Sequence, residues 1–186
     1  MNEMQLSLFS LLLILLVIKI RSQTVIKTLS GPVQGTIVNF NGNLVDQYLG
    51  IPFAHPPIGR LRFRKPYPIK PWTNIMTADR PGPACIQHSK YSYPAYDDGY
   101  KSEDCLYLNI WVPRSKYIYN NVKIPVMFFI YGGGFTISSN KIPVYNGLAL
   151  AAKGEIIVVT INHRLSTLGF FTTETGEAPG NVGKYR

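Results

Sequence analysis

The chain has 186 residues and carries 19 Lys and Arg against 10 Asp and Glu, which gives a formal net charge of +9. Hydrophobic residues make up 46% of it and charged residues 16%. This composition excludes a disordered chain, because enough apolar material is present to form a core. The 14 Pro and 16 Gly exclude a coiled coil, since both residue types interrupt long helices. The length allows one domain or part of one.

The positive charge does not indicate a nucleic-acid-binding protein. Basic residues are spread along the chain, and only residues 60–65 (RLRFRK) form a dense group. A nucleic-acid-binding protein needs a known motif or a basic face with interleaved aromatic residues, and neither is present. A solvated loop with one buried Arg explains the group equally well, so we expect no nucleic-acid partner.

The N-terminus is predicted to be a targeting segment. Residues 6–18 (LSLFSLLLILLVI) form an unbroken apolar run, which matches a signal-peptide core and is short for a bilayer span. Ser22 is a small residue suited to the position before a cleavage site. We therefore predict that residues 1–22 are a signal peptide and that the mature protein is secreted, extracellular and free of the membrane. An uncleaved membrane anchor is the alternative, because Lys19 and Arg21 follow the apolar run.

The two cysteines, Cys85 and Cys105, both lie in the exported part of the chain. An even number of cysteines in an oxidising compartment predicts a disulfide. The segment between them is polar, rich in Tyr and without apolar periodicity, so packing alone would not hold it. A bridge would stabilise the fold by ~3 kcal/mol on the loop-entropy model. Two free buried thiols are the alternative.

Short strands are predicted over residues 24–28, 33–39 and 44–49, because turn signals separate these β-prone segments. Residues 50–83 are rich in Pro and Gly and have no helical period, which predicts an ordered coil. Apolar and polar residues alternate over 105–112, as in a strand.

Two later strands have a different pattern. Residues 126–130 (VMFFI) and 156–161 (IIVVTI) are continuous apolar runs, which predicts strands covered on both faces. Residues 144–153 between them are compatible with a helix that stops at Gly154. A strand, a glycine-rich loop, a helix and a second buried strand indicate an α/β fold with a parallel sheet.

Three consecutive glycines follow the apolar run at residues 126–130. They lie in residues 131–135 (YGGGF). Glycines cost backbone entropy, so a run of them indicates that the main chain approaches something closely. Peptide N–H groups in such a turn can point at a developing negative charge. The spacing fits neither G-x-x-x-x-G-K-[ST] nor G-x-G-x-x-G, which argues against a phosphate site. A purely structural glycine turn is the alternative.

Residues 103–111 (EDCLYLNIW) resemble the second signature of the type-B carboxylesterase/cholinesterase family. Further segments of that family's pattern occur in the same order, and the resemblance covers residues 24–183. It implies an α/β-hydrolase fold with a small N-terminal antiparallel strand region and a disulfide loop, so that residues 23–186 form part of a type-B domain. The further segments are 48–54 (YLGIPFA), 56–63 (PPIGRLRF), 131–135 (YGGGF), 162–164 (NHR) and 178–183 (APGNVG).

The resemblance also implies roles for single residues. In the family, the second and third glycines of the loop donate N–H groups to the oxyanion, and here these are Gly133 and Gly134. The resemblance pairs Cys85 with Cys105. It also implies a buried structural ion pair between Arg62 and Glu103, for which an exposed Glu and Arg are the alternative.

Met76 marks a departure from the cholinesterases. They carry a Trp at this position, whose ring binds a quaternary ammonium. A thioether cannot supply that cation–π attraction, so choline esters are not the expected substrate. Met76 is expected to line the pocket together with Phe135. The predicted substrate is a small carboxylic ester, and we expect no cofactor and no metal.

A larger departure concerns the catalytic triad. Acyl transfer on this fold needs a Ser on a G-x-S-x-G elbow, followed by an acid and then a His, and the chain has no G-x-S-x-G. His55, His88 and His163 precede the position of the elbow, so each is expected to be structural or exposed. We therefore predict the N-terminal portion of a secreted serine carboxylesterase, truncated before the elbow and inactive alone. A non-catalytic, cholinesterase-like adhesion or binding domain is the alternative.

Residues 184–186 also differ from the family, which continues after the last glycine with Leu, another apolar residue, and then Asp-Gln. Gly183, Lys184 and Tyr185 can be encoded by GGT AAG TAT, which contains the common splice-donor sequence GTAAGT. We predict that residues 184–186 are translated from an intron. Arg186 would then stand where the family has an Asp that pairs with Arg164, and like charges repel.

Amplification of transcripts across the Gly183 codon tests this prediction. We expect a reading frame that continues into further family sequence. If every transcript stopped after Arg186, the prediction would be wrong.

Overall fold

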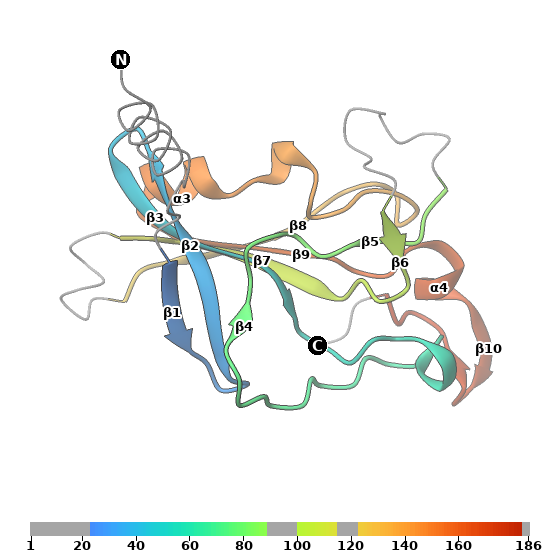
Figure 1. Ribbon diagram of the computed structural model, residues 1–186. Coiled ribbons are helices and arrows are strands. Elements are labelled where there is room, and N and C mark those ends of the chain that lie inside the picture. The colour runs from blue at the N-terminus through green and yellow to red at the C-terminus, as the bar shows by residue number, and fades with distance from the viewer. Residues whose placement is uncertain (1–22, 89–99, 115–122, 184–186) are drawn as a thin grey trace, which may run out of the picture.

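The computed structural model describes residues 23–88, 100–114 and 123–183. The predicted signal peptide at 1–22 and the predicted intron-derived residues 184–186 therefore lie outside the described residues. None of the described helices is long and apolar enough to cross a membrane. The elements in chain order (Figure 1) are β1 (Gln23–Lys27), β2 (Pro32–Phe40), β3 (Asn43–Pro52), η1 (Gly59–Leu61), β4 (Met76–Thr77), β5 (Ala84–Cys85), β6 (Lys101–Ser102), β7 (Tyr107–Pro113), β8 (Val126–Ile130), η4 (Pro143–Tyr145), α3 (Leu148–Gly154), β9 (Ile157–Ile161), α4 (Ser166–Phe170), β10 (Thr172–Thr175) and β11 (Ala178–Pro179).

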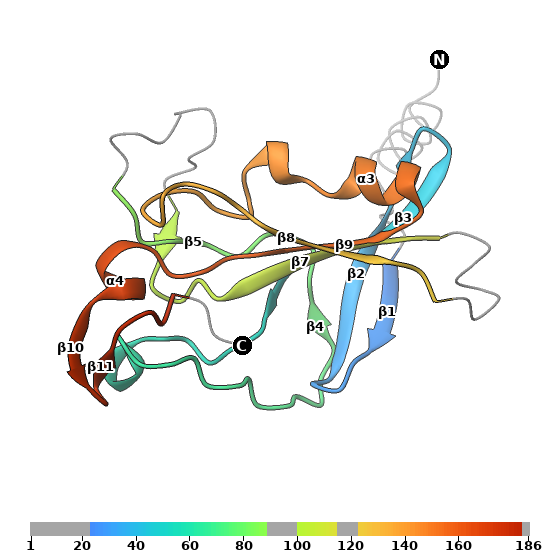
Figure 2. The same ribbon diagram turned by 180° about the vertical axis from the view of Figure 1, so that it is seen from behind.

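A mixed seven-stranded sheet forms the centre of the molecule (Figures 1 and 2). Its order is β1-β2-β3-β7-β9-β8, and β4 pairs with β2 beside this path. Along this path the strands from β1 to β9 pair antiparallel, whereas β8 is parallel to β9 and β4 is parallel to β2. This confirms the three predicted N-terminal strands. The predicted parallel sheet is confirmed for the β8–β9 pair but is wrong for the path from β1 to β9, which is antiparallel. The predicted coil at 50–83 is wrong at three places. Strand β3 continues to Pro52, and η1 and β4 form within the segment.

The hairpin between β2 and β3 follows from its turn residues. Asn41 and Gly42 both have positive φ angles, of 51° and 89°, and Asn-Gly is the favoured pair for such a two-residue turn. Asn39 Oδ1 accepts a hydrogen bond from the Gly42 N–H at 2.8 Å. The turn sets the register that pairs Val38 with Val45, and Val45 is fully buried.

The predicted helix at 144–153 is wrong at its start. Pro143–Tyr145 forms a separate 3-10 turn, and α3 begins only at Leu148, whose N–H donates to Asn146 Oδ1 at 2.9 Å. An Asn side chain that accepts this bond favours a helix start over a helix interior. The helix ends at Gly154, as predicted, and Glu155 follows in the left-handed conformation with φ 50°.

Helix α3 covers one face of the sheet (Figures 1 and 2). Its buried residues Ala151 and Ala152 belong to the same cluster as Trp111 and Val158 of the sheet. At Gly147, just before the helix, an added Cβ would overlap the side chains of Trp111 and Val158. Small residues thus let the helix approach the sheet closely.

Strand β8 lies at the edge of the sheet, and one of its faces is open. Val126, Phe128 and Ile130 are 59%, 53% and 39% exposed, whereas Met127 packs under α3. The prediction that residues 126–130 are covered on both faces is therefore wrong for the described residues. The physical reason is that α3 covers one face and no described helix packs on Phe128.

This open face predicts aggregation when residues 23–186 are expressed alone, because an exposed apolar edge strand pairs with other chains. We expect Phe128→Lys to increase the soluble monomeric fraction, measured by size-exclusion chromatography with light scattering. Met127→Lys is the matched control on the same strand and should not increase it, since its charge would be buried under α3. A wild-type monomer with a sharp thermal transition would contradict the prediction.

Candidate functional site

The predicted glycine loop leaves the sheet at the C-terminal end of β8. Tyr131, its first residue, is buried, and its hydroxyl donates to the His163 carbonyl at 3.2 Å. The rings of Tyr131 and His163 stack with centroids 4.5 Å apart, and burial raises the pKa of Tyr131 above its ordinary value. His163 follows β9, so this contact holds the start of the loop to the end of the neighbouring parallel strand.

Gly133 is the position at which the loop backbone most requires glycine. Gly133 has φ +143° and Gly134 has φ +59°, both in the region that side chains rarely adopt. A Cβ added at Gly133 would overlap the Ile137 carbonyl oxygen. The Gly133 carbonyl accepts from the N–H groups of Thr136 and Ile137 at 3.1 and 3.2 Å. A tight turn therefore closes directly over Gly133.

The N–H groups of Gly133 and Gly134 face no acceptor within the described part of the chain. Gly134 is exposed and Gly133 is partly exposed. Consecutive peptide N–H groups in such a turn form a concave donor site for an anion. The two N–H groups therefore remain available to an acceptor from outside the described residues.

Phe135 continues the loop and is exposed. Its carbonyl accepts a hydrogen bond from the Ser166 N–H at 2.8 Å. Its ring meets the edge of Phe170 in α4 at a centroid distance of 5.2 Å. The backbone and the ring of Phe135 are thus both held by α4, and the ring keeps a free surface that a ligand can contact.

A buried network of amide side chains holds the far end of the loop. The Asn140 N–H donates to Asn162 Oδ1 at 2.9 Å, and the Asn140 carbonyl accepts from Asn109 Nδ2 at 3.2 Å. Asn162 Nδ2 donates to the Pro83 carbonyl at 3.0 Å. Sequence reasoning did not assign this network. Its only signal was that Asn109 and Asn162 lie within two segments that resemble the family.

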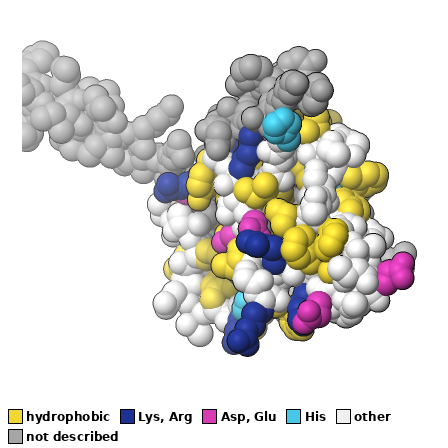
Figure 3. Space-filling model, turned by 90° about the vertical axis from the view of Figure 1, so that its right-hand side faces the viewer, with side chains coloured by type: hydrophobic (Ala, Val, Ile, Leu, Met, Phe, Trp, Pro, Cys, Tyr) yellow, Lys and Arg dark blue, Asp and Glu magenta, His cyan; other side chains and the backbone are white. Residues whose placement is uncertain are grey.

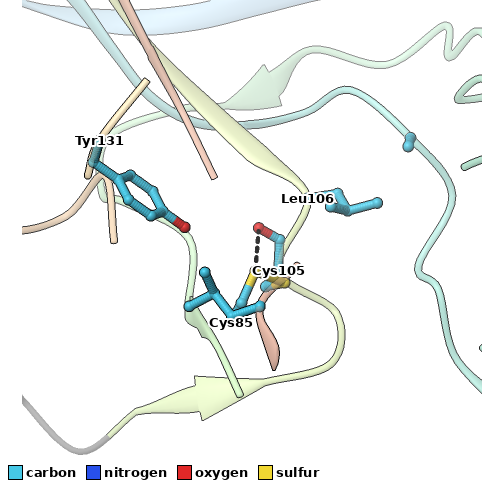
Figure 4. Packing of buried hydrophobic residues seen from close by; sticks show 6 residues of the cluster. Cys85, Cys105, Leu106 and Tyr131 are labelled. Atoms are coloured by element: carbon cyan, nitrogen blue, oxygen red, sulfur yellow. Dashed lines mark hydrogen bonds between the residues drawn. A yellow bond between two sulfur atoms is a disulfide. The ribbon is translucent and has the colours of Figure 1, made fainter. Parts of the chain in front are cut away.

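The predicted disulfide between Cys85 and Cys105 is present, with 5.0 Å between the Cα atoms. Both cysteines are buried in one cluster with Leu106 and Tyr131, as Figure 4 shows. The disulfide therefore packs against the first residue of the glycine loop. It connects β5 to the segment before β7, which lies beside β9 in the sheet.

The predicted ion pair between Arg62 and Glu103 is also present. Arg62 Nε and Nη2 donate to the two Glu103 carboxylate oxygens at 2.6 and 2.5 Å. These hydrogen bonds raise the pKa of Arg62 further above its ordinary value. The expectation that the pair is buried is wrong, since the side chains are 47% and 22% exposed. Figure 3 shows acidic and basic side chains next to one another on the face that forms the right-hand side of Figure 1, where α4 and β10 lie.

Among the described Lys and Arg side chains, Arg164 is the one that the fold buries. Its Nη2 donates to the carbonyls of Arg64 and Val182 at 2.7 and 2.5 Å. Its Nε and Nη1 are buried and have no hydrogen-bond partner among the described residues. Burial lowers the pKa of Arg164 to about 10, because the charged form is removed from water.

The other predicted site residues lie apart from the loop. Met76 packs against Val33 and Tyr48 in a cluster separate from that of Tyr131. His88 is exposed, and the His55 N–H bonds to the Tyr67 carbonyl. No group of three or more His, Cys, Asp or Glu within residues 23–88, 100–114 and 123–183 could hold a metal ion.

Comparison with known proteins identifies the family of this chain. The carboxylesterase family model matches residues 22–185. The chain belongs to the carboxylesterase family. Its parallel β8–β9 pair, with α3 in the connection, is accordingly part of an α/β-hydrolase fold.

Similar proteins include acetylcholinesterase of Electrophorus electricus, which is 42% identical over 167 residues, or 85% of this chain and 26% of that protein. Cholinesterase of Mus musculus is 38% identical over 169 residues, covering 87% and 27%. Acetylcholinesterase 1 of Caenorhabditis briggsae is 40% identical over 156 residues, covering 80% and 25%. The carboxylesterase-family chain thus spans about a quarter of the length of these relatives.

Peptide mapping of secreted material under non-reducing conditions tests the disulfide in the exported protein. We expect one peptide pair that links Cys85 to Cys105 and separates after reduction. Two thiols that alkylate freely without reductant would contradict both the disulfide and the export to an oxidising compartment.

Proposed function

We propose that this chain supplies the oxyanion-hole loop of a secreted serine carboxylic ester hydrolase. The Ser, acid and His of that enzyme lie in sequence beyond these residues, and the chain alone is inactive. One observation carries the proposal. At the C-terminal end of a parallel strand, the N–H groups of Gly133 and Gly134 lie in a turn that only glycine can form, and they bond to no described residue.

The chemistry follows from where the charge develops. When a serine attacks an ester carbonyl, the carbonyl oxygen becomes negative, and donors aimed at that oxygen lower the energy of the transition state. Donors act best when they need no rearrangement during the reaction. Here Tyr131 holds one end of the loop and Asn140 holds the other. The loss of one such donor costs about 3 kcal/mol of transition-state stabilisation.

The substrate class is a small carboxylic ester. The similar proteins named above are acetylcholinesterases and a cholinesterase, which supports ester hydrolysis. Met76 cannot attract a quaternary ammonium as an aromatic ring does, so we propose that uncharged esters are preferred over choline esters. Secretion is supported by the apolar run at 6–18 and by the disulfide.

A chimera tests the proposal, because it restores the missing catalytic residues. Residues 23–183 would be joined to the part of Electrophorus electricus acetylcholinesterase that lies C-terminal to the matched region. We expect this chimera to hydrolyse 4-nitrophenyl acetate. Gly133→Pro should lower kcat at least 100-fold, since proline removes the N–H that the oxyanion needs and cannot adopt the φ of +143° that the turn requires.

Gly132→Ala is the matched control for this variant. An added Cβ at Gly132 meets no atom within 4 Å, and its N–H is not one of the two proposed donors. We expect less than a threefold change in kcat, with both variants checked for folding by thermal melting. Undiminished turnover by a folded Gly133→Pro chimera would show that the oxyanion assignment is wrong.

A further inference from the structure

We infer that Gln87 is a positioning residue for the glycine loop, which holds Gly133 and Gly134 in place through Ser138. The inference rests on the proposed function, because positioning has a kinetic meaning only if these glycines serve an oxyanion. Gln87 lies two residues after Cys85 and 51 residues before Ser138 in the sequence. None of the sequence motifs described above includes it.

The carboxamide of Gln87 binds both backbone groups of one loop residue. Its Oε1 accepts from the Ser138 N–H at 2.8 Å, and its Nε2 donates to the Ser138 carbonyl at 2.9 Å. This is the pattern by which a neighbouring strand would bind that residue. Two bonds to one residue restrict its orientation as well as its position. No other described group bonds to the Ser138 backbone.

Ser138 is a residue that needs such support. Its φ is +101°, a strained conformation for a residue with a side chain, which persists only where its surroundings enforce it. The preceding residue, Ile137, closes the turn by donating to the Gly133 carbonyl at 3.2 Å. A Cβ added at Gly133 would lie 3.2 Å from the Ser138 Cβ. A rotation of the backbone at Ser138 would therefore open the turn at Gly133.

Gln87 is itself held by the disulfide-bonded strand. Its Nε2 also donates to the Cys85 carbonyl at 3.1 Å, and Cys85 is joined to Cys105. A chain of contacts thus runs from the disulfide through Gln87 to Ser138 and the glycine turn. The disulfide in this arrangement does more than close the loop between its two cysteines, because it supplies a rigid base for the carboxamide.

The test uses the chimera defined above with Gln87→Met, which keeps the length of the side chain and removes all three hydrogen bonds. We expect kcat to fall about tenfold with KM within twofold, less than the roughly 100- to 1,000-fold loss on removal of a donor. A trifluoromethyl ketone, which forms a tetrahedral oxyanion adduct, should bind weaker by the same factor as kcat/KM falls. Gln87→Glu keeps the acceptor for the Ser138 N–H and should lie between Gln87→Met and wild type.

Gln34→Met is the matched control. Gln34 is partly buried in β2, and its side chain forms no hydrogen bond with a described residue. We expect its kcat, KM and ketone affinity to stay within twofold of the unmodified chimera. If Gln87→Met matched this control in ketone affinity, or lost activity only in proportion to titrated active sites, Gln87 would not be a positioning residue.

Hydrogen exchange of the same proteins separates this inference from the proposed function. We expect Gln87→Met to speed exchange at least tenfold in the peptide that contains Ser138, and Gln34→Met to leave it unchanged. Unchanged exchange in Gln87→Met would overturn the inference even if the unmodified chimera were active. An inactive unmodified chimera would count against the proposed function alone, and the exchange result would still decide the role of Gln87.

Discussion

The structure around the candidate site depends on how the backbone between β8 and α3 satisfies its buried polar groups. Residues 131–147 contain a single 3-10 turn, so most of their peptide groups have no regular partners. A buried N–H or carbonyl without a partner costs about 1–3 kcal/mol. Asn109 and Asn162 supply the partners for the buried Asn140, and Gln87 supplies those for Ser138. Side-chain amides thus do for this segment what a neighbouring strand does elsewhere.

These amides are positioned by the pairing of the central strands. Asn109 lies in β7 directly opposite Thr160 of β9, and its Nδ2 also donates to the Thr160 hydroxyl at 3.3 Å. Asn162 follows β9 by one residue, and its N–H donates to the Tyr107 carbonyl at 2.9 Å. A shift of register between β7 and β9 would turn these side chains to the opposite face of the sheet. The geometry of the glycine loop is therefore set by the sheet.

Much of the scaffold could be predicted from the sequence, because its signals are local. Apolar runs indicated the parallel β8–β9 pair, and three glycines after β8 indicated the loop. Burial could not be predicted in this way, since it depends on what packs against an element. Phe128 is exposed although its strand is apolar throughout, and Arg62 pairs with Glu103 at the surface rather than in the core. Gln87 gave no sequence signal at all, because a single amide has no period and its partner lies 51 residues away.

Two energetically unfavourable features lie next to Gly183. Phe128 and Gly183 line one apolar hollow on the open face of the sheet, where exposed apolar area is unfavourable. The backbone N–H of Arg164 donates to the Gly183 carbonyl at 3.0 Å, whereas its buried guanidinium nitrogens Nε and Nη1 have no described partner. A buried cation is tolerated when a carboxylate and further hydrogen bonds compensate it. The two features have different physical causes, hydration of apolar surface and desolvation of a charge. Each costs free energy, which the buried clusters and the hydrogen bonds elsewhere in the described residues must offset.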